Sequence, residues 1–342
     1  MINSNFRETL IKNNTISIIG AGGWGTALST VLVNNGFNIR IWAKEKETVD
    51  DININHQNST FLPNVKLDEH IYASNNLEEF RDEEFIITAV PTQFIRTLFK
   101  DNKLDLTNKY ILNIAKGIEK NTLLRCSQIF IELGLNPENY VVITGPSHAE
   151  EVALQIPTTI VSASEDYDLA LFVQNLLSNE YFRIYTNNDL IGCELGGSLK
   201  NVIAISAGII EGLGLGDNTK AALITRGLAE ISRLAIAMGA NPYTMFGLAG
   251  LGDLFVTCSS KHSRNRFVGE MLGIGQKLSQ ILANMKMVAE GVETTISAQE
   301  LSKLHNVEMP IIQKVYQILF EDLDPNLAIH QLMTRSAKHE WL

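Results

Sequence analysis

The segment 15–33 reads TISIIGAGGWGTALSTVLV and constrains the fold more than any other stretch of the chain. Ile16, Ile18 and Ile19 form a short β-branched run that predicts one buried strand of a parallel sheet. The next six fit G-x-G-x-x-G, and the small and apolar residues after them predict a helix. In such a unit Gly20 permits the tight turn, Gly22 lets a pyrophosphate approach the backbone, and Gly25 lets helix and strand pack closely. The unpaired N–H groups at the helix N-terminus then face the phosphates, so the segment predicts a dinucleotide site.

Seven further segments have the character of strands: 38–42, 71–74, 85–90, 110–115, 140–144, 158–163 and 181–185. Strands that alternate with helices at this spacing predict a parallel, doubly wound sheet, whose ligands bind outside the carboxyl ends of the strands. From about Asn188 on no convincing strand appears. We therefore expect an α/β dinucleotide-binding domain of the Rossmann type over 14–188, and an all-α substrate domain over 189–342.

Composition narrows the class of protein. A chain of 342 residues is too long for one ordinary core, which supports two domains. The formal charge of −10 argues against nucleic acid or an anionic membrane surface as a partner, although a phosphorylated metabolite can still bind in a local basic pocket. The three cysteines have no metal-ligand spacing and fit a reducing cytoplasm. Residues 1–14 do not read as a signal peptide, and the longest apolar run, 202–210, is too short to cross a bilayer.

Lys200 interrupts the apolar helix expected over 195–210. Its neighbours on the same face, three and four residues away, are two glycines, an isoleucine and an alanine, which would leave space around the ammonium. A lysine is rarely buried unless it is paired or functional, and burial would lower its pKa into the range of a general base. The alternative is a structural lysine at the edge of the helix.

Polar residues in three loops are further candidates. Ser147 and Glu150 have the spacing of a capping box that would start a helix, in a loop that either covers the ligand or only caps that helix. Asp253 closes a glycine-rich loop and would orient an ammonium or a substrate hydroxyl, unless it is an ordinary helix N-cap. Ser263 is expected as an N-cap whose following Arg264 suits a phosphate, the alternative being an exposed basic helix start.

Cofactor choice is left open by two residues after the second strand, where the adenosine ribose of a dinucleotide would lie. Glu45 favours a free 2′-hydroxyl, as in NAD, whereas Lys44 favours the 2′-phosphate of NADP.

These motifs carry a resemblance to a known family. The segments are GAGGWGTAL, AVPTQ, AKGIE, TGPSHAEEV, ELGGSLKNVIAISAGIIEGLGLGDNTKAALITRGLAE, GLAGLGDL with TCSS, and HSRNR. Together they resemble NAD(P)-dependent glycerol-3-phosphate dehydrogenases of the bacterial type, in family order and over essentially the whole chain after the first dozen residues. The resemblance implies oxidation of sn-glycerol 3-phosphate to dihydroxyacetone phosphate or, in bacteria, mainly the reverse reaction for phospholipid synthesis.

The resemblance also implies roles for single residues. Lys200 matches the proton acceptor of the family, and Lys116 matches a lysine that touches both substrate and cofactor. Other positions match substrate contacts: Gly145, Ser147, Asp253, Ser263, Arg264 and Asn265. A further set matches cofactor contacts: Gly23, Trp24, Ala149, Arg264, Val288 and Glu290. Gly23 stands where serine is frequent, which would be harmless for a backbone contact, and Lys44-Glu45 stands where the family often has two basic or imidazole side chains.

Two other functions are compatible with parts of the sequence. A related hydroxyacid dehydrogenase would share the fold and an interdomain lysine, but the Ser-Arg-Asn and Gly-Pro-Ser signatures oppose it. A non-catalytic nucleotide sensor is opposed by the joint presence of Lys116, Lys200 and Asp253. The number of chains that assemble is open, a homodimer included.

Overall fold

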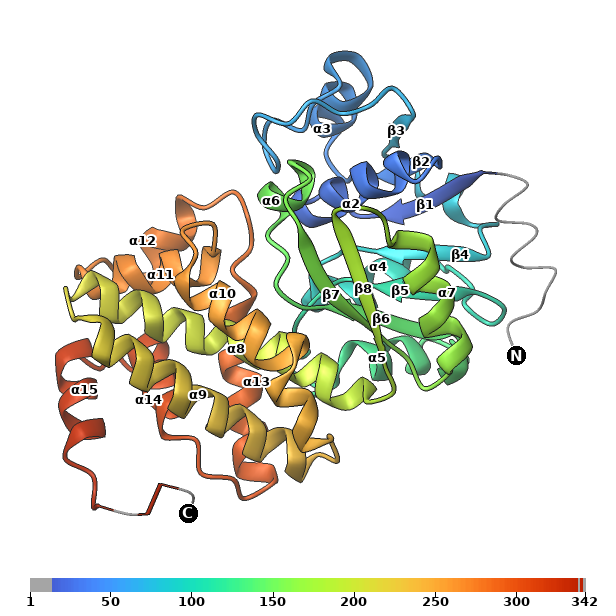
Figure 1. Ribbon diagram of the computed structural model, residues 1–342. Helices are drawn as coiled ribbons and strands as arrows, with labels where there is room; N and C mark the ends of the chain where they lie inside the picture. The colour runs from blue at the N-terminus through green and yellow to red at the C-terminus, as the bar shows by residue number, and fades with distance from the viewer. Residues whose placement is uncertain (1–13, 338, 341–342) are drawn as a thin grey trace.

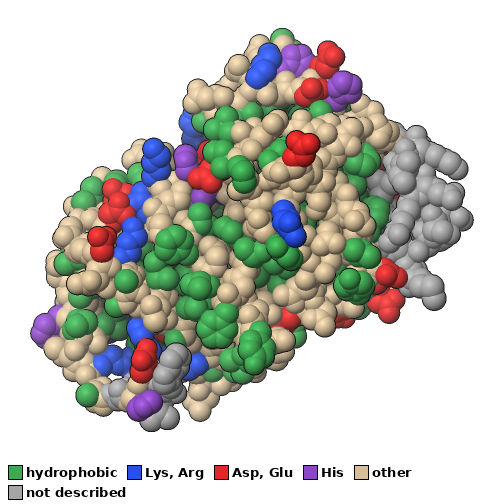
Figure 2. All heavy atoms as spheres, in the orientation of Figure 1, with side chains coloured by type: hydrophobic (Ala, Val, Ile, Leu, Met, Phe, Trp, Pro, Cys, Tyr) green, Lys and Arg blue, Asp and Glu red, His purple; other side chains and the backbone are tan. Residues whose placement is uncertain are grey.

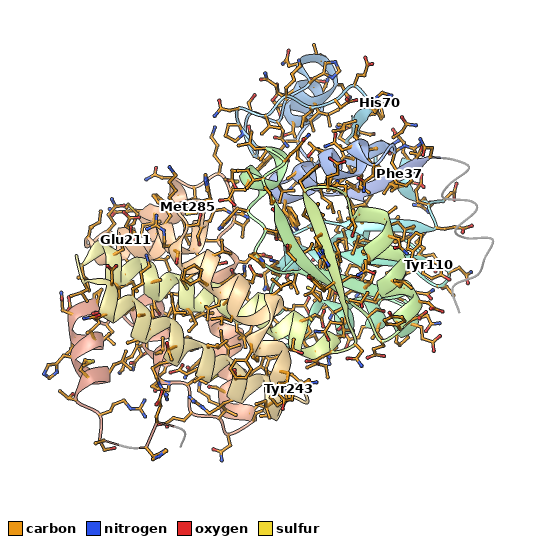
Figure 3. All side chains as sticks on the ribbon, in the orientation of Figure 1. Phe37, His70, Tyr110, Glu211, Tyr243 and Met285 are labelled. Carbon is orange, nitrogen blue, oxygen red and sulfur yellow. The ribbon has the colours of Figure 1, made fainter. Side chains whose placement is uncertain are left out.

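The computed structural model describes residues 14–337, 339 and 340. The expectation that the N-terminus carries no signal peptide therefore falls almost entirely outside the described residues. Figure 1 shows a lobe built on a β-sheet and a lobe built of helices. Phe37 and Tyr110 belong to the sheet lobe, whereas Glu211, Tyr243 and Met285 belong to the helical lobe (Figure 3).

The described residues form an eight-stranded sheet in the order β3-β2-β1-β4-β5-β6-β7-β8. Its strands are β1 (Thr15–Ile19), β2 (Asn38–Trp42), β3 (Ile71–Ser74), β4 (Phe85–Thr88), β5 (Tyr110–Asn113), β6 (Tyr140–Thr144), β7 (Thr158–Ala163) and β8 (Phe182–Asn187). Each expected strand is confirmed. β1 pairs in parallel with both β2 and β4, so the strand order reverses next to the glycine turn that follows β1. This reversal is where doubly wound sheets bind their ligands.

The sheet is mostly parallel, as expected, and departs from the parallel arrangement at one strand pair. β7 runs antiparallel to β6, and β8 is parallel to β7. A parallel crossover needs a long connection that usually holds a full helix, whereas an antiparallel pair tolerates a short one. The connection from β6 to β7 contains only the five-residue helix α6 (Ala149–Ala153), so the chain turns back along β6.

Helices cover both faces of the sheet (Figure 1). The helical segments of this part are α2 (Gly23–Asn34), α3 (Lys46–Asp50), η1 (Asp51–Asn55), η2 (Leu77–Phe80), α4 (Thr92–Asp101), α5 (Cys126–Glu132), η3 (Pro137–Asn139), α6 and α7 (Tyr167–Leu177). Successive side chains of β6 point to opposite faces: Val141 joins a core with α2 and α7, and Val142 joins a core with α4 and α5. Both faces are therefore buried, as expected for a doubly wound sheet.

In the described part of the chain after β8, all regular secondary structure is helical. Its segments are α8 (Leu190–Gly212), α9 (Asp217–Ala237), η4 (Pro242–Phe246), η5 (Leu248–Gly252), α10 (Asp253–Ser259), α11 (Arg264–Gly273), α12 (Leu278–Ala283), α13 (Glu290–Leu304), α14 (Pro310–Phe320) and α15 (Pro325–Met333). Within the described range α8 is long and apolar enough to cross a membrane, but its apolar window is wholly buried inside the protein. It is the central core helix of this lobe.

Glycines let α8 and α11 pack backbone against backbone. A Cβ on Gly208 would overlap the carbonyl oxygen of Arg266, and one on Gly269 would overlap that of Ile205. This close crossing brings the N-terminus of α11 beside the middle of α8.

A buried carboxylate ties the start of α8 to the sheet lobe. Oε1 of Glu194 accepts hydrogen bonds from the Ser127 amide at 2.8 Å and from the Tyr140 hydroxyl at 2.9 Å. Its Oε2 accepts from the Ser127 hydroxyl and from the Arg125 guanidinium. A carboxylate with four donors holds α8 in one position relative to β6 and α5, and this in turn fixes where Lys200 lies, six residues further on.

Candidate active site

Lys200 lies at the centre of the candidate site, on the buried middle of α8 with 6% of its surface exposed. Its ammonium donates hydrogen bonds to Oδ1 of Asp253 and, at 2.7 Å, to the hydroxyl of Thr257. Asp253 and Thr257 are one turn apart on α10 and so face the same side. The ammonium is therefore buried and paired, and it does not lie at the exposed edge of the helix as the alternative supposed.

Asp253 links two lysines. While Oδ1 accepts from Lys200, Oδ2 accepts from the ammonium of Lys116 at 2.8 Å. The carboxylate is 1% exposed and belongs to the first turn of α10, whose N-cap is Gly252. Of the two sequence alternatives for Asp253, the structure supports the one in which it orients an ammonium.

Burial and charge set the protonation of this chain of groups. Burial lowers the pKa of Lys200 to about 8; the attraction of Asp253 opposes this shift, and the positive charge of Lys116 adds to it. Burial by itself would raise the pKa of Asp253, but the charges and hydrogen bonds of the two lysines hold it below its usual value. At neutral pH the site therefore holds a carboxylate and an ammonium that loses its proton just above neutrality.

Lys116 enters from the sheet lobe, three residues after β5 ends. Its ammonium also donates to the carbonyl oxygen of Gly145 at 3.2 Å. A Cβ on Gly197 would lie 2.6 Å from the Thr144 hydroxyl and 3.6 Å from Cδ of Lys116. The sequence predicts that the small neighbours of Lys200 leave empty space around it. At Gly197 that space is instead occupied by side chains of the sheet lobe.

The turn after β6 differs from its predicted form. α6 begins at Ala149, and its N-cap His148 makes no side-chain capping bond. The hydroxyl of Ser147 donates instead to the Gly145 carbonyl at 2.9 Å, so the predicted capping box is wrong. The bond is possible because Gly145, with φ of +139°, bends the chain back toward the hydroxyl. The turn therefore presents its backbone to Lys116, and Ala149 lies beside the glycine turn, 3.7 Å from the position of a Cβ on Gly23.

The Ser-Arg-Asn signature starts α11 next to Lys200. Ser263 is its N-cap and accepts from the Arg266 amide at 3.2 Å, as predicted, and Arg264 is the first residue of the helix. The Asn265 amide donates to the Asn201 side chain at 3.0 Å, and its oxygen accepts from the Gly291 amide at 2.9 Å. This network joins α8, α11 and the start of α13.

Arg264 and Arg266 have different surroundings. The guanidinium of Arg266 pairs with Glu211 at 2.6 Å and with Glu270 at 3.1 Å, and donates to the Ser260 carbonyl. Arg266 is therefore a buried structural arginine, whereas Arg264 is exposed at the start of α11.

The glycine turn fits a dinucleotide diphosphate. Gly20 has a φ of +118°, and a Cβ there would lie 2.8 Å from the Ala89 backbone; one on Gly25 would overlap the Gly20 carbonyl. Gly22, in contrast, faces open space, and α2 begins without any side-chain cap. Exposed helix N–H groups behind an open glycine are what a diphosphate requires. Trp24 follows Gly23 in the first turn of α2.

Residues from both lobes surround the same sheet edge. Lys44 and Glu45 are exposed just after β2, the strand whose last carbonyl accepts from the Gly20 amide at 3.0 Å. Glu290 starts α13, and its carboxylate accepts from the Thr92 amide of α4 at 3.1 Å. Burial raises the pKa of this carboxyl. Val288, two residues earlier, is 43% exposed.

Comparison with known proteins decides the family. Two family models of NAD-dependent glycerol-3-phosphate dehydrogenases match the chain, the N-terminal one over residues 15–170 and the C-terminal one over residues 189–330. The chain belongs to this family. The D-mandelate dehydrogenase structure, 14% identical with a TM-score of 0.59, shares only the fold.

Other members of the glycerol-3-phosphate dehydrogenase family are similar over nearly the whole chain. The NAD(P)+ enzyme of Macrococcus caseolyticus is 48% identical over 330 residues, 95% of this chain and 99% of the relative. That of Bacillus subtilis is 48% identical over 329 residues, 95% of each chain. The glycerol-3-phosphate dehydrogenase structure from Coxiella burnetii has a TM-score of 0.89 at 38% identity, and covers 94% of this chain and 99% of that one.

Two residues of this glycerol-3-phosphate dehydrogenase site were missed by sequence reasoning. Thr257 binds the ammonium of Lys200, and Asn201 binds Asn265. Thr257 had a usable signal, because it lies four residues after Asp253 and must share its helix face. Asn201 had none beyond its position next to Lys200.

Proposed function

We propose that the protein interconverts sn-glycerol 3-phosphate and dihydroxyacetone phosphate with NAD(H) or NADP(H), and that Lys200 accepts and donates the proton. The observation that carries the proposal is the buried Lys116–Asp253–Lys200 chain beside the N-terminus of α11. The dinucleotide supplies or accepts the hydride. Residues 14–188 would bind it, and residues 189–342 would provide Lys200 and the substrate phosphate site.

Each group of the chain has a role in this proposal. Lys200 takes the proton of the C2 hydroxyl during oxidation and returns it during reduction. Asp253 keeps that ammonium aimed at one place, and Lys116 polarises the carbonyl oxygen. Arg264, Asn265 and the neighbouring helix amides hold the phosphate, with Ser263, Gly145 and Ser147 completing the pocket.

The cofactor would lie along the glycine turn. Gly20, Gly22, Gly23, Trp24 and Gly25 would face the diphosphate. Further cofactor contacts are proposed for Lys44, Glu45, Lys116, Ala149, Arg264, Val288 and Glu290.

The proposal is tested by assaying dihydroxyacetone phosphate reduction with NADH and NADPH in parallel, with 2-keto acids as alternative substrates. Turnover of the phosphorylated ketone supports it. Turnover of keto acids alone would favour a hydroxyacid dehydrogenase. NADH binding without turnover of any of these substrates would favour a nucleotide sensor.

In the cell the reductive direction would supply glycerol 3-phosphate for phospholipid synthesis, in the cytoplasm. This part of the proposal rests on the family resemblance and on the scattered cysteines, which are free and buried.

We also propose a homodimer. Tyr243, Phe246 and Phe255 are 82%, 66% and 59% exposed and come from η4 and α10, which both pack against the intervening segment η5. Figure 2 shows apolar side chains gathered over the lower middle of this face of the molecule. Apolar patches of this kind on a soluble enzyme typically mark a protein–protein interface.

The two reaction directions should respond to pH in opposite ways around the pKa of Lys200, about 8. Oxidation needs the neutral amine, so its kcat/KM should rise as pH increases through 8. Reduction needs the ammonium, so its kcat/KM should fall over the same interval. Rate profiles between pH 7 and 10 in both directions check this, above the range in which the substrate phosphate itself titrates, about 6. Profiles that slope the same way in both directions would rule out Lys200 as the proton carrier.

Glu45→Arg should shift cofactor preference toward NADPH. The change removes a carboxylate that repels the 2′-phosphate and adds a fork that binds it, while Lys44 stays in place. The parent is expected to use both cofactors. The ratio of kcat/KM for NADPH to that for NADH measures the shift, with Glu47→Arg on the same exposed segment as control. An unchanged ratio would mean that Glu45 does not face the ribose.

A further inference from the structure

The segment between η1 and β3 crosses the glycine turn and is fastened to it by one side chain. Asn58 is 1% exposed, and its amide nitrogen donates to the Ala21 carbonyl and to the Thr26 hydroxyl, both at 2.8 Å. Ala21 lies inside the glycine turn, and Thr26 lies in the first turn of α2. One amide group therefore joins the turn to the helix that follows it.

Two further hydrogen bonds connect residues on either side of Asn58 or next to it. The Asn58 side-chain oxygen accepts from the Phe61 amide at 3.2 Å, and Asp51 accepts from the Ser59 amide at 2.8 Å. With both amide hydrogens and the oxygen engaged, the side chain has a single way to lie. We call residues 51–67 the strap.

Gly23 lets the strap approach α2 closely. A Cβ on Gly23 would lie 2.7 Å from the Phe61 carbonyl oxygen, a distance that real Cβ atoms do not tolerate. The absence of a side chain at position 23 therefore has a steric role in this chain, in addition to the backbone contact expected from sequence. A serine there would have to push the strap away from the turn.

We propose that Asn58 is a positioning residue that holds the glycine turn ready for the diphosphate of the cofactor. The inference rests on the proposed function, because it assumes that this turn binds a dinucleotide. Without the amide, the buried Ala21 carbonyl and the Thr26 hydroxyl lose their shared donor, and the turn is free to sample other conformations. Binding must then order the turn, and the cost appears as weaker cofactor affinity.

The test compares Asn58→Ala with Asn53→Ala, a matched control in the same strap. Asn53 also makes two bonds, but to the backbone of Ala73 in β3, both at 2.8 Å. We expect Asn58→Ala to raise the Kd for NADH about tenfold, as for the loss of one to two hydrogen bonds. KM for dihydroxyacetone phosphate and kcat at saturating NADH should stay within about twofold. Asn53→Ala should lower the melting temperature without changing the Kd.

A second variant keeps the inference testable if Asn58→Ala folds poorly. Thr26→Val removes one of the two acceptors at constant volume and should raise the Kd for NADH by a smaller factor. The Thr26 hydroxyl also donates to the Ala21 carbonyl at 3.4 Å. In the double variant the two factors should therefore combine to less than their product, because the Asn58–Thr26 hydrogen bond is common to both single variants.

NADH affinity equal to that of the parent in Asn58→Ala, or in Thr26→Val if only that variant folds, would overturn the inference. So would losses of affinity that track the melting temperature in all variants, Asn53→Ala included. A parent that binds neither NADH nor NADPH would instead refute the proposed function.

Discussion

Lys200→Met is expected to lower kcat for dihydroxyacetone phosphate reduction by about 10²–10⁴-fold or more, the usual contribution of general acid–base catalysis. Methionine fills a similar volume but carries no proton. The substitution also removes one of the two cations that stabilise the buried Asp253, which keeps its bond to Lys116. Cofactor affinity should be preserved, because the glycine turn belongs to the sheet lobe.

The control is Lys314→Met, another partly buried lysine, which donates to Gln317 and Gln331 far along the chain from the site. It should leave kcat unchanged. The measurements are kcat, the Kd for NADH by titration, and the melting temperature of each variant. A Lys200→Met enzyme that turns over within about tenfold of the parent would remove Lys200 from the proton transfer.

The sheet and the glycine turn were predictable because their signals are local. A β-branched run followed by G-x-G-x-x-G strongly favours a strand, a tight turn and a helix. A lysine within an otherwise apolar helix indicates a buried charge. What surrounds that charge was not predictable in the same way. Asp253 meets Lys116 across 137 residues of sequence, and only the packing of α10 against the sheet lobe brings them together.

The errors have one physical origin. Ser147 and Glu150 satisfy the capping-box spacing, yet the serine bonds backward to Gly145 because that glycine bends the chain at positive φ. The reversal of β7 likewise depends on a connection too short for a crossover, and strand propensity says nothing about direction. The close approach of the strap to Gly23, about which sequence reasoning made no prediction, also depends on a carbonyl 38 positions away in the sequence. Each of these features depends on the path of the backbone, which a local sequence pattern does not determine.

Arg264→Ala is expected to raise KM for dihydroxyacetone phosphate by about 10–150-fold, since a charge-assisted hydrogen bond contributes roughly 1.5–3 kcal/mol. The chain is acidic, with a formal charge of −10, so a phosphorylated substrate needs cations at one place. Arg264 begins α11, where the helix amides also favour an anion, and Arg266 is already occupied by Glu211 and Glu270. We expect the parent to turn over unphosphorylated dihydroxyacetone poorly, and this turnover should barely change in the variant.

Two further variants separate charge from geometry. Arg264→Lys keeps the charge but loses the planar fork, and should fall between parent and alanine variant. Lys261→Ala removes an exposed cation three residues earlier and should change KM little. Because Arg264 is also proposed to touch the cofactor, the Kd for NADH must be measured in every variant. Equal losses for the phosphorylated and unphosphorylated ketone, at unchanged NADH affinity, would place the phosphate site elsewhere and leave Arg264 a structural residue.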